Sequence, residues 1–174
     1  VERVVISQGP GSFTGIKVGL SFVYGLQMAN PNLRVKGVSS LELLAKTSSE
    51  RHNCDAVMIL PATRTHGFLA EANAQGVTSR LLELAVDLPR LKEQAAGRQT
   101  VLCRPWPALQ EQWDPNLPQL QQRNMEQLLD EALDVMVAAT AADPTFSQDF
   151  LPARYLRLST AEEKLGVAAV EAPQ

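Results

Sequence analysis

The segment Gly9–Gly15 (GPGSFTG) constrains the fold of this chain more than any other part of its sequence. It lies between the apolar run Val4–Ile6 and a helical pattern over Ile16–Ala29, so it predicts a strand, a tight turn and a helix. Glycines at 9, 11 and 15 allow backbone conformations that a Cβ forbids. The first N–H groups of the helix are then free to bind an anion.

This turn gives two interpretations that the sequence leaves open. In the first, it is an anion site formed by Gly9, Gly11, Ser12, Thr14 and Gly15. In the second, it is only a strand-to-helix turn, with Ser12 or Thr14 as the helix cap. Stricter enzymatic patterns do not fit, because Gly15 is followed by isoleucine instead of the Lys-Ser/Thr of a Walker loop. A Rossmann fingerprint or a nucleophile elbow would need glycine at position 14.

Strand and helix patterns alternate along the chain and predict an α/β fold. We expect a first subdomain at 1–49, a hinge in the polar segment Ser48–Asp55, a second subdomain at 50–158 and a tail at 159–174. In the first subdomain we also expect a strand at Leu33–Val38 and a helix opened by Ser39 and Glu42 as a capping box. In the second subdomain the expected strands are Ala56–Leu60, Phe68–Ala74, Ser79–Leu84, Thr100–Cys103 and Arg154–Leu158. The expected helices there are Pro89–Ala96 and the long Gln119–Ala142, with an irregular loop at Pro105–Pro118 between them.

The helix after the glycine turn, Thr14–Asn30, is apolar on more than one side. At about 100° per residue, one side carries residues that would pack on a sheet: Ile16, Leu20 and Val23. The outer side carries Val18, Phe22, Gly25 and Ala29, which need a second cover. That cover is either another subunit, with Gly25 setting the distance of approach, or a helix of the same domain.

No residue set in the sequence predicts catalysis or a metal site. His66 near Thr63 and Thr65 is most simply a hydrogen-bonded surface residue, and Asp130 and Asp134 are a solvated helix face. Trp106 and Trp113 are better explained as parts of a packed crossover than as a lid. The net charge of −3 argues against a general nucleic-acid surface. Two unpaired cysteines and the lack of a long apolar stretch are typical of a cytoplasmic protein without membrane contact.

Three segments together resemble the TsaB (YeaZ-like) family. They are Gly9–Leu20, Val38–Glu42 and Pro152–Arg157, in the family's order. The resemblance implies an actin-like/Hsp70-like (ASKHA) α/β fold of two subdomains, with the opening strands and helix of the first one absent from this chain. A further family string that begins with an acidic residue corresponds to Pro61–Phe68, where proline takes the acidic position.

The resemblance also implies a function. A TsaB-like chain is the non-catalytic partner of a TsaD-type catalytic subunit, with a TsaE-type ATPase in the same pathway, in the transfer of threonylcarbamoyl to the adenosine next to the anticodon of tRNA. It carries no cofactor, pairs with itself when alone and meets tRNA only through the complex. The alternative is a stand-alone phosphate- or nucleotide-binding enzyme of the ASKHA superfamily, a phosphotransferase or a peptidase.

Overall fold

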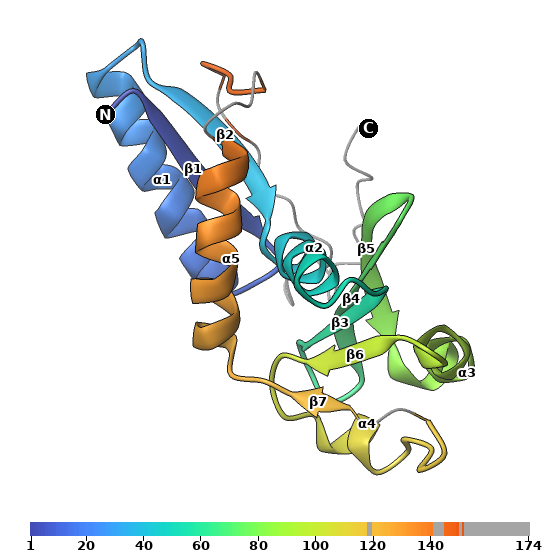
Figure 1. Cartoon of the computed structure of the whole chain (residues 1–174). Coiled ribbons are helices and arrows are strands. Elements are labelled where there is room, and N and C mark those ends of the chain that lie inside the picture. Colours follow the sequence, from blue (N-terminus) through green and yellow to red (C-terminus); the bar gives the residue numbers. More distant parts are fainter. Residues whose placement is uncertain (118–119, 141–144, 150, 152–174) are drawn as a thin grey trace. The chain divides into compact units, whose positions relative to one another are not determined.

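A computed structural model describes residues 1–117, 120–140, 145–149 and 151 (Figure 1). These residues form two compact units, 1–40 with 145–149 and 151, and 41–117 with 120–140. The boundary predicted between residues 49 and 50 falls inside helix α2 (Ser40–His52). The polar segment that suggested a hinge is therefore helical up to His52, and most of α2 groups with the second unit.

The first unit is a strand–helix–strand unit. Strand β1 (Arg3–Gly9) leads through the glycine turn into α1 (Phe13–Ala29), and the chain returns in β2 (Arg34–Ser39). The two strands pair in parallel, and Figure 1 shows α1 alongside them. A small core forms where Val23 meets Leu33 and Val35, with Val4 and Ile6 packed against it. The predicted strand, helix and strand are thus confirmed, although the capping residue Ser39 belongs to β2 and α2 begins one residue later.

The second unit contains a five-stranded sheet in the order β5-β4-β3-β6-β7. Strands β3 (Ala56–Pro61), β4 (His66–Asn73) and β5 (Gly76–Glu83) lie where the sequence predicts strands, and they form an antiparallel meander. Strand β6 (Gln99–Leu102) runs parallel to β3, and the short β7 (Gln121–Gln122) runs parallel to β6.

Strand β3 is buried on both faces, which explains its unbroken apolar sequence. Its alternate residues Val57 and Ile59 belong to the main core of this unit. The other buried members of that core are Leu69, Leu82, Leu84, Leu91, Leu102, Trp106 and Leu109. This core lies between the sheet and the two helices that follow β5 and β6, namely α3 (Leu84–Ala95) and α4 (Pro107–Gln110).

Two predicted helix starts are wrong. Helix α3 begins at Leu84 and not at Pro89, because the Asp87 carboxylate accepts the backbone N–H of Glu83 at 2.8 Å and holds the first turn in front of the proline. Helix α5 begins at Met125 and not at Gln119, because Gln121 and Gln122 pair with β6 as β7.

Helix α5 extends to Thr140, and within the predicted irregular loop the short α4 forms. The predicted strand Arg154–Leu158, the string Pro152–Arg157 and the tail 159–174 lie outside the described residues. None of the helices in the described ranges is both long and apolar enough to span a membrane.

Candidate functional site

The glycine turn is built around a single strained position. Gly9 has a φ of +111° and is buried at a register shift between β1 and β2, a conformation that favours glycine. Gly11 and Gly15 have no positive φ, and a Cβ at Gly11 would meet nothing within 4 Å. The expectation that all three glycines serve the backbone conformation is therefore wrong for Gly11 and Gly15.

Ser12 is the cap of α1. Its hydroxyl accepts the backbone N–H of Gly15 at 3.3 Å, and its carbonyl accepts the N–H of Ile16 at 2.9 Å. The turn is fixed from the other side by Ser40, whose hydroxyl donates to the carbonyl of Pro10 at 2.9 Å. Of the five residues predicted as an anion site, Gly9 is buried, while Gly11, Ser12, Thr14 and Gly15 are exposed side by side. An anion there would compete with Ser12 for the N–H of Gly15, and the anion site stays a prediction.

Helix α1 has the two apolar faces that its sequence predicts. Ile16, Leu20 and Val23 are at most 9% exposed. On the outer side, Val18 and Phe22 are 64% and 67% exposed. Gly25 and Ala29 continue the same exposed side by helical spacing. These four residues, Val18, Phe22, Gly25 and Ala29, are called the α1 outer face below.

The small residues of α1 serve different purposes. A Cβ at Gly19 would lie 3.3 Å from Cδ1 of Ile6, so this glycine lets the helix approach β1 closely. A Cβ at Gly25 would meet nothing within 4 Å, so nothing near it in the described structure requires glycine there. Met28 is 79% exposed and enlarges the exposed apolar surface beside Gly25 and Ala29.

A segment from near the end of the chain covers a different side of α1. Tyr24 donates its hydroxyl to the carbonyl of Leu151, and the Gln27 amide donates to the carbonyl of Gln148 at 3.0 Å. Ser147 exchanges two backbone hydrogen bonds with Val35 of β2. The polar side of α1 thus contacts Gln148 and Leu151, whereas the α1 outer face remains exposed.

Of the residues considered for catalysis, His66 has structural partners. His66 Nδ1 lies 2.9 Å from the Thr65 hydroxyl, and Thr63 Oγ1 accepts the backbone N–H of His66 at 3.0 Å. These three residues therefore stabilise the β3–β4 turn. Asp130 and Asp134 are exposed on α5. Over the described residues, no group of three or more His, Cys, Asp or Glu side chains is placed to hold a metal ion.

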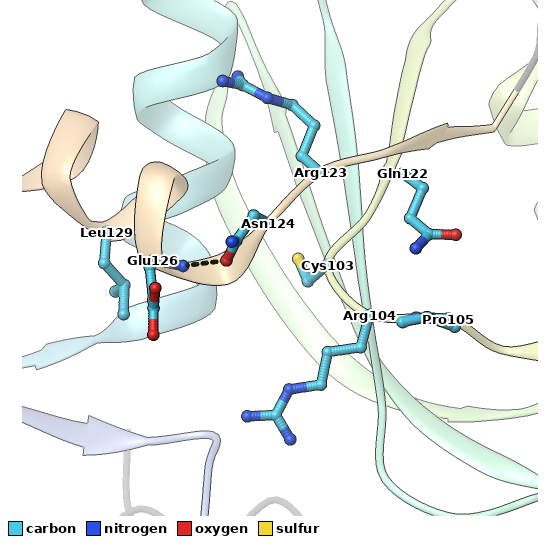
Figure 2. A pocket seen from close by; sticks show the side chains of 8 residues that line it. All are labelled: Cys103, Arg104, Pro105, Gln122, Arg123, Asn124, Glu126 and Leu129. Atoms are coloured by element: carbon cyan, nitrogen blue, oxygen red, sulfur yellow. Dashed lines mark hydrogen bonds between the residues drawn. The ribbon is translucent and has the colours of Figure 1, made fainter.

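A pocket of about 630 Å³ opens where β6 and β7 end (Figure 2). It is lined by the residues after β6, the residues around the end of β7 and the first two turns of α5: Cys103, Arg104, Pro105, Gln122, Arg123, Asn124, Glu126 and Leu129. Asn124 accepts the backbone N–H of Glu126 at 2.9 Å and caps α5. Figure 2 shows the guanidinium groups of Arg104 and Arg123 pointing to opposite sides.

Charges in this region are partly paired. Arg123 makes two hydrogen bonds to the carboxylate of Glu131, at 3.2 and 2.5 Å, and Arg51 of α2 lies 3.7 Å from the same carboxylate. The hydrogen bond from Arg123 holds the pKa of Glu131 below its usual value. Burial raises the pKa of the Cys103 thiol to about 12, and the charge of Arg104 offsets only part of that rise. The thiol at the pocket floor is therefore protonated and unreactive at neutral pH.

The residues of this pocket were not predicted from the sequence. The long helix predicted over Gln119–Ala142 would contain both Arg123 and Glu126, but Arg123 precedes α5 and pairs with Glu131. A signal was present, because Arg104 is the second residue after the buried strand β6 and the carboxyl ends of parallel strands commonly carry ligand-binding residues. This signal indicates a pocket only together with the pairing of β7 with β6, which brings the residues after both strands to one edge of the sheet.

Comparison with known proteins gives two informative likenesses. Residues 1–95 match the family model described as TsaD, tRNA N6-adenosine threonylcarbamoyltransferase, a span from β1 through α3. The crystal structure of an uncharacterized protein with similarity to peptidase YEAZ, from Pseudomonas aeruginosa, is similar with a TM-score of 0.58 and 17% identity. That match covers 90% of this chain and 74% of the other chain.

A second structure, YeaZ from Pseudomonas aeruginosa, has a TM-score of 0.44 and 17% identity, covering 80% of this chain and 68% of that one. No curated protein matched the sequence. The likeness to the first structure and the family match confirm the predicted fold class, an α/β fold of the actin-like/Hsp70-like type.

Proposed function

Because this chain belongs to the tRNA N6-adenosine threonylcarbamoyltransferase family, as a TsaB/YeaZ-like member, we propose that it is the partner subunit of a TsaD-type catalytic subunit. In this role it supports threonylcarbamoyl transfer to adenosine in tRNA without supplying the reacting groups itself. The single observation that carries the proposal is the α1 outer face, an exposed apolar stripe on a helix whose opposite side is buried.

The exposed stripe fits a helix-packing contact. Val18, Phe22, Gly25 and Ala29 are spaced by four, three and four residues, so they form one ridge along α1. Phe22 supplies the large apolar anchor, and Gly25 and Ala29 leave room for a neighbouring backbone. An exposed apolar ridge of this kind marks an association surface. Since the catalytic partner belongs to the family whose description this chain matches, its own helix at the same position is a suitable counterpart.

The same surface supports the other proposed associations. Alone, the chain forms a homodimer through the α1 outer face, because an isologous contact can bury the ridge against itself. The catalytic subunit replaces one copy in the complex. The TsaE-type ATPase joins the assembled complex, and tRNA is modified there. His66, which was considered as a base, has Thr63 and Thr65 as hydrogen-bond partners, which supports a non-catalytic role.

The test is Phe22→Glu, with Val86→Glu as the matched control. Val86 is 70% exposed on α3, so both variants place one negative charge on an exposed apolar residue. A charge buried in a contact without a partner costs several kcal/mol, roughly 3–5. We expect Phe22→Glu to be monomeric by light scattering and to lose the TsaD-type subunit in co-purification, with an unchanged circular-dichroism spectrum.

The control should keep both associations. If Phe22→Glu still binds the catalytic subunit as tightly as the unmodified chain, the α1 outer face is not the contact. Turnover of nucleotide by the chain alone that disappears on Ser12→Ala or Thr14→Ala would instead establish the stand-alone enzyme.

A further inference from the structure

The three parallel strands of the second unit end together at one edge of the sheet, and each is followed by an arginine. Arg104 is the second residue after β6, Arg123 directly follows β7, and Arg64 lies in the turn after β3. Backbone hydrogen bonds hold these strand ends side by side: Cys103 N–H donates to Ile59 at 2.9 Å, and Arg123 N–H donates to Leu102 at 3.2 Å. Arg64, Arg104 and Arg123 are called the arginine edge below.

The turn that carries Arg64 is attached to the same edge. The indole N–H of Trp106 donates to the carbonyl oxygen of Arg64 at 3.1 Å, and Trp106 follows Arg104 by two residues. Trp106 itself is buried in the core of the unit. The backbone positions of Arg64 and Arg104 are therefore fixed relative to each other, although both side chains are exposed.

The three arginines of this edge differ in whether they have a charged partner. Arg123 is neutralised by Glu131. Among the residues that the structure describes, the guanidinium groups of Arg64 and Arg104 have neither a hydrogen bond nor an ion pair. Among the described residues that line the pocket, Glu126 is the one acidic side chain. Exposed arginines without a protein partner, on a chain with a net charge of −3, form a local positive site within an acidic protein.

We propose that the arginine edge binds phosphates of an RNA backbone, with Arg64 and Arg104 as the contacting side chains and the Gln122 amide as a neutral donor. Guanidinium groups are well suited to phosphate because their N–H donors match its oxygens. The carboxyl ends of parallel strands are also the usual position of ligand sites in α/β sheets. The proposal rests on the proposed function for the identity of the RNA, since that function supplies a tRNA substrate.

Binding of a fluorescein-labelled RNA stem–loop, measured by fluorescence anisotropy at low and moderate salt, tests the proposal. It is measured on the full chain alone and on its complex with the TsaD-type subunit. Arg104→Ala and Arg64→Ala should each weaken binding by about three- to tenfold. Each should also reduce the slope of the logarithm of the binding constant against the logarithm of the salt concentration by about one, because one fewer cation is released on binding. Arg90→Ala removes the same charge from the exposed side of α3 and should change neither value.

A second pair of variants should act in the opposite direction. Glu126→Gln removes an acidic group from the lining of the pocket that Arg104 also lines and should strengthen RNA binding, whereas Glu93→Gln on α3 should not. Equal effects of Arg104→Ala and Arg90→Ala would overturn the proposal. So would binding of ATP or pyrophosphate that depends on Arg104 while RNA binding does not, because the site would then be one for free phosphates.

The experiments distinguish a failure of the proposed function from a failure of the arginine-edge proposal. If the chain does not bind the catalytic subunit, the proposed function fails, and RNA binding by the chain alone still tests the arginine edge. If the complex forms but the arginine variants bind RNA normally, only the arginine edge fails.

Discussion

The indole N–H of Trp106 donates to the carbonyl oxygen of Arg64 at 3.1 Å and connects the segment after β6 to the turn between β3 and β4. The same indole ring explains a glycine, because a Cβ at Gly67 would lie 3.0 Å from Trp106 Cζ3 and from the Leu60 carbonyl oxygen. Trp106 is 2% exposed, so it stabilises the core and at the same time holds the turn that carries Arg64.

Replacing Trp106 with phenylalanine should therefore destabilise the second unit. The change removes the donor and leaves the Arg64 carbonyl without its partner, which costs about 1–3 kcal/mol. Urea denaturation followed by circular dichroism measures the effect. Gly67→Ala should be destabilising as well, and the double variant should lose less than the sum of the two single losses, because the smaller ring makes room for the added methyl group. Additive losses would show that the ring does not restrict Gly67.

Glycines of the turn should respond differently to substitution. Gly9→Ala forces a Cβ into a φ of +111° and should cost about 1–3 kcal/mol. Gly11→Ala is the control, since Gly11 has no positive φ and open space at its Cβ position, and it should leave stability unchanged or slightly higher. Thermal unfolding of both variants decides the question, and a loss at Gly11 equal to that at Gly9 would contradict this account of the turn.

The contribution of Glu131 to stability should depend on pH. Its pKa is lower in the folded state than in the unfolded state, mainly because of the hydrogen bond from Arg123, so the folded state binds fewer protons in that range. The stabilisation is complete above the unfolded pKa of about 4.3 and is lost as the pH falls through the lower folded value. Glu131→Gln should thus be less stable than the unmodified chain at pH 7, and the difference should shrink below about pH 4.

Urea denaturation at several pH values measures this difference. Glu126→Gln is a suitable control, because the Glu126 carboxylate has no ion pair within the described part of the chain. A stability difference for Glu131→Gln that is the same at pH 3 and pH 7 would contradict the role of the Arg123 hydrogen bond.

The two cysteines should react at very different rates. Cys54 is exposed, whereas Cys103 is 1% exposed and its pKa is raised to about 12. An aromatic disulfide reagent at pH 8 should modify one thiol quickly and the second only as the protein unfolds. Cys54→Ser should remove the fast phase and leave the slow one. A fast reaction of Cys103 in the native protein would show that the pocket floor opens readily.

Local sequence patterns were sufficient for much of the fold. Val4–Ile6, the glycine turn and Ile16–Ala29 predicted β1, the turn and α1, because each element has its own periodicity and the turn residues break it. The two faces of α1 followed from the same spacing. The starts of α3 and α5 could not be predicted this way, since they depend on the Asp87 carboxylate and on pairing of Gln121 and Gln122 with β6.

The sequence by itself determined the strand–turn–helix at the start of the chain, the α/β class and the apolar outer side of α1, since these depend on residues close together along the chain. Only the tertiary structure decided which glycine is strained and which strand ends meet. Arg64, Arg104 and Arg123 are separated by long stretches of sequence and lie at one edge solely because β3, β6 and β7 are parallel neighbours. Hydrogen bonds between strands that are far apart in the sequence do not require any periodic pattern of residues, so such contacts cannot be predicted from local sequence patterns.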